Sequence, residues 1–416
     1  MKRASSARPT RVWTRSLTRL LALLGVGALL GGCSGLSLGQ APTPQPVVII
    51  VTATPTVAAA TSAARNPPTM VPAATLAVPV DTTALPTDSS VVTSTGLLQR
   101  VRERGRLICG TNADLPGFGL YDRVRDTWSG FDVDFCRAVA AAIFGDANAV
   151  EFIGLNTSGR NERFDSIRSG AVDVLFRNTT WTLGRDIAQL AFGPTTFHDG
   201  QTFMVRADAG VTTSVGLAGK RVCVARGTTS EQNLNDDFAA RGITFTAVLY
   251  DDENQLYPAY DRGECDAVTS DSSQLVSKRQ TLTKPSAHTI LGERISREPL
   301  GPAFIEGDEQ WRDVVTWVVF ATFYAEEVRV NQANVADLVK SSTDPRVRRL
   351  LGVEGDFGKG LGLSNDFAYA IISEVGNYGD IYERNLGPTT PFALDRGPNK
   401  VWNLGSGGVL ASPPFR

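Results

Sequence analysis

The chain has 416 residues, with 41 basic and 43 acidic side chains that give a formal net charge of −2. This balance excludes the basic surface by which proteins bind the nucleic-acid backbone. The length exceeds what one compact core covers, so we expect two lobes together with non-globular segments. The two histidines, His198 and His288, have no cysteine or acidic cluster at ligand spacing, so we expect neither a metal nor another cofactor.

The N-terminal region has the pattern of a signal peptide. Residues 1–19 hold six basic side chains and no acidic one, and an apolar run follows from Leu20 to Leu30. We predict a signal peptide over residues 1–32, with an apolar core too short to span a bilayer. The sequence Leu30-Gly31-Gly32-Cys33 resembles a bacterial lipobox. That resemblance implies that Cys33 carries lipid and anchors the protein to the outer, extracytoplasmic face of the cell membrane. The alternative is a plain secretory signal with a chance cysteine.

Residues 33–96 are rich in threonine, proline and alanine. Between Ser34 and Gly96 the charged residues are Arg65, Asp81 and Asp88, and nine prolines are spread along the segment. Such a composition cannot bury a core, and it predicts a disordered, semi-extended tether. The apolar run Val47–Val51 has the composition of a strand, but no partner strand is evident in the sequence.

Strands and helices alternate from Leu97 onward. We predict helices over 97–104, 131–142 and 162–168, and strands over 106–111, 151–155 and 172–176. This alternation predicts a parallel sheet covered on both faces, with ligands at the C-terminal ends of its strands. The loop Asn112–Phe118 and the run Arg177–Asp186 both follow such strand ends. We assign residues 97–204 to the first part of lobe 1.

A second α/β series predicts lobe 2 over residues 205–297. Gln201–Arg206 has the pattern of an extended crossing segment. The predicted strands cover 221–225, 243–249 and 266–270, and the predicted helices cover 227–240 and 255–260. The last of these strands runs into Asp271.

The remaining residues, 298–416, return to lobe 1 and form a helical extension. Glu298–Pro302 is the predicted return crossing, and long helices follow over 309–329, 334–340 and 365–382. In the first of these helices one side carries Trp311, Val315, Val318, Thr322 and Phe323. The expected fold is therefore α/β with two lobes, in which lobe 2 is inserted into lobe 1 and two crossings form a hinge.

Two runs have the chemistry of a carboxylate site. Arg177–Asp186 combines hydroxyls, backbone amides and a guanidinium, and Gly227–Glu231 opens a helix directly after a strand. An arginine offers a carboxylate two parallel hydrogen bonds, and amides at a helix start add donors. The alternative for each run is an N-capped surface helix. Two such runs in one chain favour a ligand held between two halves.

From about Leu97 to Arg416 the chain resembles the solute-binding proteins of polar amino-acid ABC transporters, most closely the general L-amino-acid-binding type. The matching runs are Gly130–Ala142, Asp173–Asp186, Gly227–Glu231, Leu350–Gly355, Gly376–Gly387 and Pro413–Arg416. The resemblance implies the two-lobed periplasmic-binding-protein type II fold.

The resemblance also implies roles for particular residues. Arg185 holds the ligand's α-carboxylate with help from Thr180 and Thr228. Asp271 accepts the α-ammonium, with Asn178 as a further polar contact. For Asp271 the sequence by itself favours an exposed cap of the next helix.

Three more residues are candidates for the pocket. Arg163 corresponds to a position that contacts an acidic ligand side chain in some relatives, and the alternative is a solvated arginine. Phe118 and Trp181 are candidates for the pocket wall, with core packing as the alternative. Many single-substrate relatives have glycine or another small residue at Arg177-Asn178, so this departure favours broad specificity.

Four cysteines remain after Cys33, and an extracytoplasmic compartment favours their pairing. Cys109 and Cys136 belong to the predicted lobe 1, and Cys223 and Cys265 to lobe 2. Of three possible pairings, only Cys109–Cys136 with Cys223–Cys265 keeps both bridges inside a lobe. We predict that pairing, because it leaves hinge closure unhindered.

The expected function is binding without chemistry. A monomer captures a free L-amino acid between its lobes, closes, and delivers the ligand to an ABC transporter permease. Two alternatives come from other classes. One is a dehydratase- or lyase-type enzyme on the same scaffold, which would need an acid or base poised at the ligand. The other is an amino-acid sensor module that signals through a separate partner.

Overall fold

The computed structural model describes residues 47–51, 96–159 and 161–416. The predicted signal peptide, Cys33 and most of the predicted tether lie outside the described residues. Within the described part of the chain, no helix is both long and apolar enough to cross a bilayer.

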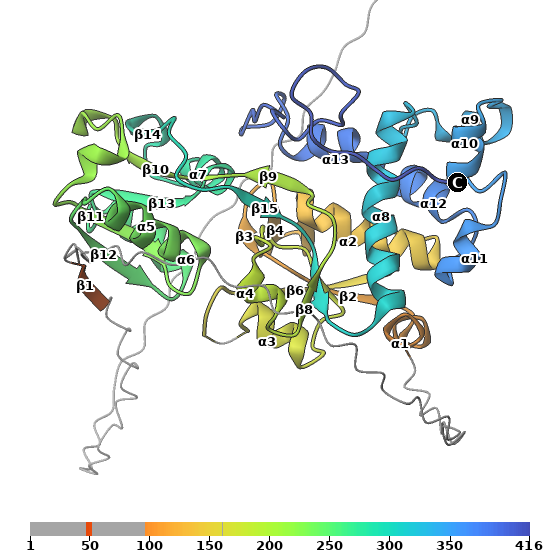
Figure 1. Cartoon of the computed structure of the whole chain (residues 1–416), viewed down its shortest axis with the longest axis horizontal. Coiled ribbons are helices and arrows are strands. Elements are labelled where there is room, and N and C mark those ends of the chain that lie inside the picture. The colour runs from red at the N-terminus through yellow and green to blue at the C-terminus, as the bar shows by residue number, and fades with distance from the viewer. Residues whose placement is uncertain (1–46, 52–95, 160) are drawn as a thin grey trace, which may run out of the picture. The chain divides into compact units, whose positions relative to one another are not determined.

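Lobe 1 is built on a five-stranded sheet (Figure 1). Its strands, in spatial order, are β6 (Val150–Gly154), β2 (Leu107–Thr111), β7 (Val174–Leu175), β16 (Ala303–Ile305) and β8 (Leu190–Phe192). β2 pairs in parallel with β6 and β7, as the sequence predicts, but β16 runs antiparallel to both of its neighbours. The sheet is therefore mixed, because the chain returns from lobe 2 in the opposite direction.

Successive residues of these strands enter two different cores, as the pleat of a strand requires. Leu107 and Cys109 pack into the large core that also contains helices α2 (Phe131–Phe144) and α8 (Glu309–Glu327). Ile108 packs into the opposite core with α3 (Arg163–Arg168). Burial on both faces explains why the strands are mostly apolar.

Helix α2 begins at a glycine for a steric reason. Gly130 has φ +132°, and a Cβ there would lie 2.2 Å from the carbonyl oxygen of Phe118. Asp132 and Asp134 occupy the first turn, where carboxylates interact favourably with the helix dipole. The start of α2 is thus held tightly against the loop that follows β2. That loop leads into a small three-stranded sheet, with β3 (Asp114–Leu115), β4 (Gly119–Asp122) and β5 (Thr127–Ser129).

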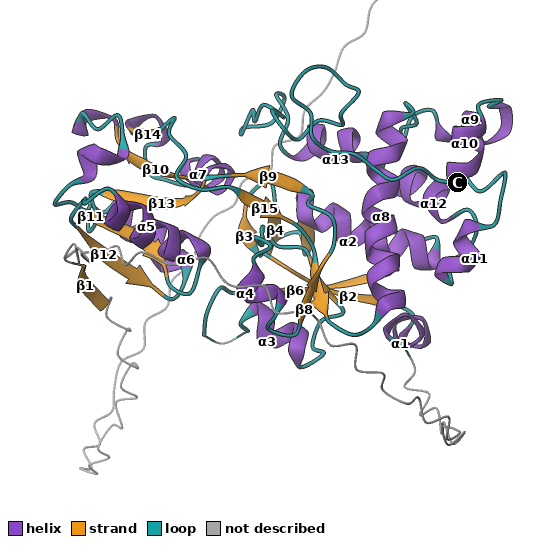
Figure 2. Ribbon diagram, in the orientation of Figure 1, coloured by secondary structure: helices purple, strands orange, loops and turns teal. Residues whose placement is uncertain are grey.

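Lobe 2 contains a six-stranded sheet. Its spatial order is β1 (Val47–Val51), β12 (Phe245–Tyr250), β11 (Arg221–Ala225), β13 (Ala267–Asp271), β10 (Gln201–Arg206) and β14 (His288–Ile290). Val222 and Val224 pack into a core with α5 (Thr229–Ala240), whereas Cys223 packs on the other face with α6 (Glu253–Asp261) and α7 (Ser272–Arg279). Helices therefore cover both faces of this sheet, as Figure 2 shows.

The strand β1 corrects one expectation. Val47–Val51, for which the sequence shows no partner, pairs antiparallel with β12 over five residues. β12 would otherwise be an edge strand with unpaired backbone groups, and such an edge accepts an added strand of suitable composition.

The connection between the lobes also differs from the sequence prediction. Gln201–Arg206 is β10, which lies within the sheet of lobe 2 and is not a crossing segment. The chain therefore passes from the sheet of lobe 1 to the sheet of lobe 2 before Gln201, and not at the predicted boundary after residue 204. The crossing strands are β9 (Phe197–Asp199) and β15 (Glu298–Leu300), which pair antiparallel. The predicted return crossing Glu298–Pro302 contains β15.

The C-terminal helices pack around α8 and α2 (Figure 1). They are α9 (Val335–Ser341), α10 (Pro345–Leu350), α11 (Phe357–Leu361), α12 (Phe367–Glu374) and α13 (Tyr378–Asn385). α8 is buried on the predicted side and begins at Asp308, whose Oδ1 accepts from the Trp311 backbone at 2.9 Å. The predicted single helix 365–382 is wrong. The chain instead forms two helices, α12 and α13, separated at Gly376 (φ +100°). The side chains of Asn377 and Asp380 then form a capping box at the start of α13.

Both predicted disulfides are confirmed. Cys109–Cys136 joins β2 to α2, and Cys223–Cys265 joins β11 to the residues just before β13. Each bridge links elements of one lobe, so neither restricts movement of one lobe against the other.

Removing the lobe 2 bridge should lower stability without affecting the cleft. The Cys223–Cys265 loop spans 42 residues, for which the chain-entropy estimate is about 4 kcal/mol. We expect Cys223→Ser/Cys265→Ser to shift the urea unfolding midpoint downward under oxidising conditions. The same variant compared with wild type under a reductant serves as the control, because the difference should then vanish. An unchanged midpoint under oxidising conditions would contradict the expected stabilisation.

Candidate functional site

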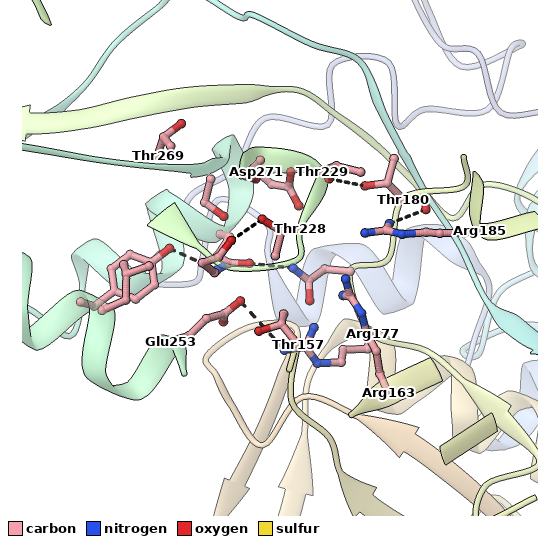
Figure 3. A pocket seen from close by; sticks show the side chains of 17 residues that line it. Thr157, Arg163, Arg177, Thr180, Arg185, Thr228, Thr229, Glu253, Thr269 and Asp271 are labelled. Carbon is pink, nitrogen blue, oxygen red and sulfur yellow. Dashed lines mark hydrogen bonds and ion pairs between the residues drawn. The ribbon is translucent and has the colours of Figure 1, made fainter. Parts of the chain in front are cut away.

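Loops from both lobes meet at the C-terminal ends of the parallel strands and line one cavity (Figure 3). Lobe 1 contributes side chains from the end of β7, from α3 and from α4 (Leu183–Asp186). Lobe 2 contributes the starts of α5, α6 and α7. The lining residues are Thr157, Arg163, Arg177, Asn178, Thr180, Arg185, Ala225, Thr228, Thr229, Ser230, Glu253, Leu256, Tyr257, Thr269, Ser270, Asp271 and Gln274.

Arg185 is positioned by the short helix α4. The Thr182 hydroxyl accepts from the Arg185 backbone N–H at 3.3 Å and so caps the helix. The Arg185 guanidinium donates through Nη1 to the Thr180 carbonyl at 2.6 Å and lies over the Phe164 ring, 5.2 Å from its centroid. Burial lowers the pKa of Arg185, and the nearby Asp271 opposes that shift. The remaining guanidinium donors can serve a carboxylate.

The two threonine-rich loops contact each other across the cleft. Thr180 Oγ1 donates to Glu298 Oε2 at 2.5 Å and lies 3.4 Å from Thr229 Oγ1. Thr228 donates to the Ala225 carbonyl and caps α5 by accepting from the Glu231 backbone. Each run therefore caps a helix, as the alternative interpretation stated, and each also lines the cavity.

Asp271 lies opposite Arg185 on the same cavity. It holds the N-cap position of α7, but its side chain makes no capping hydrogen bond and is 6% exposed, so the predicted exposed cap is wrong. Its Oδ1 has no hydrogen-bond partner among the described residues. Burial raises the pKa of Asp271 well above its usual range, and the carboxylates of Asp199 and Glu298 raise it further. A cationic ligand group would offset this cost.

Arg163, Arg177 and Asn178 line the cavity from lobe 1. The two arginines are each 3% exposed, so the solvated alternative for Arg163 is wrong. Within the described chain, Arg163 Nε, Arg177 Nη1 and Asn178 Oδ1 are buried without hydrogen-bond partners. Asn178 Nδ2 donates across the cleft to Gln274 Oε1 at 2.7 Å. Buried polar atoms usually have partners, so these atoms have unused capacity to bond a group that enters the cavity.

Two predicted wall residues lie elsewhere. Phe118 is 1% exposed and packs edge-on against Phe131 and Phe197 in the main core of lobe 1. Trp181 is 44% exposed, stacks on Phe192 and donates to Asp186. Neither lines the cavity, because Phe118 turns inward and Trp181 turns outward from its loop.

Sequence reasoning missed several lining residues, of which Glu253, Tyr257 and Gln274 are the most polar. Asp252 caps α6 directly after β12, and Glu253 is the first residue of that helix. A helix start after a parallel strand was the signal that identified Gly227–Glu231, and the same signal was present here. Gln274 comes one turn after Asp271 on α7.

The lobes also contact each other outside the cavity. Lys278 Nζ donates to the Asp114 carbonyl at 2.8 Å, and Ser277 Oγ donates to the Pro116 carbonyl at 2.6 Å. Asn254 Nδ2 donates to Asp114 Oδ2 at 3.2 Å. The predicted loop Asn112–Phe118 thus meets lobe 2 beside the cavity and closes the cleft.

Asp132 should make stability depend on pH. Burial raises the pKa of its carboxyl to about 7. The Asn178 backbone N–H donates to Asp132 Oδ2 at 3.1 Å, and this hydrogen bond opposes the rise. A raised folded-state pKa means that stability falls as pH rises from about 4 toward 7. Asp132→Asn keeps a hydrogen-bond acceptor for the Asn178 backbone and removes this loss of stability at higher pH. Its thermal midpoint relative to wild type should rise with pH over that range and level off above it. Asp146→Asn, at an exposed position, is the control; a difference that did not vary with pH would contradict the argument.

Comparisons with known proteins agree with this geometry. Residues 107–340 match the bacterial extracellular solute-binding proteins, family 3. The chain is 46% identical over 326 residues to the general L-amino acid-binding periplasmic protein AapJ of Rhizobium johnstonii, covering 78% of this chain and 94% of that protein. It is 44% identical over 324 residues to the glutamate/glutamine/aspartate/asparagine-binding protein BztA of Rhodobacter capsulatus, with the same coverage of 78% and 94%.

A solved structure confirms the two-domain fold. The ABC transporter periplasmic binding protein from Brucella ovis, with glutathione bound, superposes with a TM-score of 0.74 at 44% identity, covering 77% of this chain and 99% of that one. The family model, the relatives and the solved structure together show that the chain belongs to the bacterial extracellular solute-binding proteins, family 3.

Proposed function

We propose that this protein is the substrate-binding component of an amino-acid ABC importer, which captures L-amino acids by hinge closure. The observation that carries the proposal is that Arg185 and Asp271 line one cavity from opposite lobes. A zwitterion needs an anion-binding end and an acidic end, because each desolvated charge must find a charged or dipolar partner. The relatives AapJ and BztA are named as amino-acid-binding proteins, which supports the same ligand class.

The α-carboxylate would bind to Arg185, with the Thr180 hydroxyl and the amide end of α5 at Thr228 as further donors. The α-ammonium would bind to Asp271, which lines the cavity and whose Oδ1 has no hydrogen-bond partner in the described part of the chain. Asn178 would supply a carbonyl oxygen to the same ammonium. A micromolar ligand has a binding free energy of roughly −8 kcal/mol, and each bond to a charged group contributes about 1.5 to 3 kcal/mol. A clamp with a few such bonds is therefore sufficient for micromolar affinity.

Closure would occur by rotation about β9 and β15. The contacts of Asn178 with Gln274, Thr180 with Thr229, and Lys278 with Asp114 each join one lobe to the other. Such contacts form only when the cleft is closed, so they and the ligand together favour the closed form. We take residues 205–297 as lobe 2, extended at its start to include β10.

Delivery to a membrane permease would follow from the family role. We further propose that the mature protein begins at a lipidated Cys33, acts as a monomer, and is held at the extracytoplasmic face by the tether 33–96. Cells grown with labelled palmitate should label this protein, and Cys33→Ser should remove the label. An equal label on both proteins would contradict lipidation at Cys33.

The enzyme and sensor alternatives receive less support. The family and the similar relatives are binding proteins, and none of the named relatives is an enzyme. Incubation with each amino acid and a search for product tests the enzyme alternative directly. A thermal-shift screen over the twenty amino acids and glutathione, which was bound in the Brucella ovis structure, identifies the preferred ligand.

Replacing Arg185 tests the main proposal. Arg185→Ala removes about two charge-assisted bonds, or roughly 3 to 6 kcal/mol, so we expect affinity to fall by about 10²- to 10⁴-fold. Isothermal titration calorimetry with the preferred amino acid measures this loss. Arg125→Ala is the matched control, because that side chain is 79% exposed in the β4–β5 turn. Near-normal titration of Arg185→Ala would refute the assignment.

A further inference from the structure

Arg177 and Glu253 face each other at the end of the cavity away from the Arg185–Asp271 clamp (Figure 3). Arg177 comes from lobe 1 and Glu253 from lobe 2. Arg177 Nη2 and Glu253 Oε1 are 4.0 Å apart, and their side chains are 3% and 11% exposed. This distance is the outer limit of an ion pair and too long for a hydrogen bond. The two charges therefore attract each other across the cleft without filling each other's hydrogen-bonding capacity.

Both partners have unused bonding capacity. Arg177 Nε donates to the Leu155 carbonyl at 3.0 Å, but its Nη1 is buried without a partner in the described chain. Arg163 Nε, beside it, is also unpartnered there. No described residue donates a hydrogen bond to the Glu253 carboxylate. This end of the cavity thus presents donors on one side and an acceptor on the other, and the buried donors need partners.

A second cavity of about 250 Å³ begins beyond this pair. Thr157, Arg177 and Glu253 line both cavities. The second cavity also has carboxylates at Asp114 and Asp252 and cations at Arg123 and Lys278. A ligand side chain that passes Glu253 would therefore enter polar space with acidic groups within it.

We propose that Arg177 and Glu253 are a specificity-determining charge pair that allows the site to accept amino acids with side chains of either charge. This inference rests on the proposed function. An acidic or amide side chain takes the free donors of Arg163 and Arg177. A cationic side chain takes Glu253, and a long one continues toward the second cavity. Because no hydrogen bond joins the pair, either ligand engages one partner without breaking such a bond.

A purely structural pair would behave differently. If Arg177 and Glu253 only held the lobes together, loss of either charge would weaken every ligand by the same factor, since closure is common to all of them. A specificity pair changes the order of preference among ligands. The discriminating measurement is therefore a comparison of ligands, made separately on each variant.

The experiment titrates alanine, glutamate and lysine by calorimetry into wild type, Glu253→Gln and Arg177→Gln. Alanine is the reference because its side chain is too short to reach the pair. We expect Glu253→Gln to weaken lysine by at least about tenfold relative to alanine and to leave glutamate equal or tighter. Arg177→Gln should weaken glutamate by a similar factor relative to alanine and leave lysine equal or tighter. Glu264→Gln is the matched control in lobe 2, because its side chain is 44% exposed and outside both cavities.

Equal changes for all three ligands, or no binding of lysine by wild type, would overturn the proposal. If Arg177→Gln fails to fold because it loses the bond to the Leu155 carbonyl, Glu253→Gln decides alone, since no described residue donates a hydrogen bond to the Glu253 carboxylate. Failure of wild type to bind any amino acid in the screen of all twenty would instead refute the proposed function.

Discussion

The buried charges around one cavity require compensation, and much of the arrangement of this protein follows from that requirement. Arg185, Arg163 and Arg177 come from lobe 1, and Asp271 and Glu253 face them from lobe 2. Burial disfavours the charged forms of Arg185 and Asp271, as the directions of their pKa shifts indicate. Asp271 is further disfavoured by its acidic neighbours. In the proposed function, a ligand with an ammonium and a carboxylate would supply the opposite charges at both ends, and the same electrostatic need would couple binding to closure.

The fold meets this need by bringing several helix starts to one place. In both lobes the parallel strands end toward the cleft, so the loops after β7, β11, β12 and β13 converge there. Each of these loops opens a helix, and the free backbone amides of a helix start favour anions. Among the described residues, the antiparallel pair β9–β15 joins the two sheets with two strands. A narrow connection of this kind permits rotation while each lobe remains intact.

The disulfides and the helical extension stabilise each lobe separately. Cys109–Cys136 fastens α2 to its sheet, and Cys223–Cys265 links β11 to the start of β13. α8 lies against α2 and contacts the C-terminal helices, and its Trp311 donates to the Asp173 carbonyl at 3.0 Å. In the proposed hinge closure, two lobes that are each fastened internally would concentrate the movement at β9, β15 and the cleft contacts.

Local patterns in the sequence determined most of the helices and strands, the helix starts within Arg177–Asp186 and Gly227–Glu231, and the pairing of the cysteines within lobes. These features depend on periodicity, capping residues and short-range order, which are present in the sequence itself. Resemblance to a family added the roles expected of Arg185 and Asp271, and the structure brings both residues to one cavity.

Only the tertiary structure decided which side chains face that cavity. Phe118 and Trp181 are aromatic residues of the kind that line pockets. The Phe118 side chain nevertheless packs in the core, and the Trp181 side chain lies at the surface. Glu253 lies opposite Arg177, and β1 lies beside β12, because segments far apart in the chain meet in space. The sequence also placed the crossing at Gln201–Arg206, since an extended apolar run looks the same inside a sheet and between two sheets. Pairing with β13 decides that point, and such pairing is a property of the folded chain.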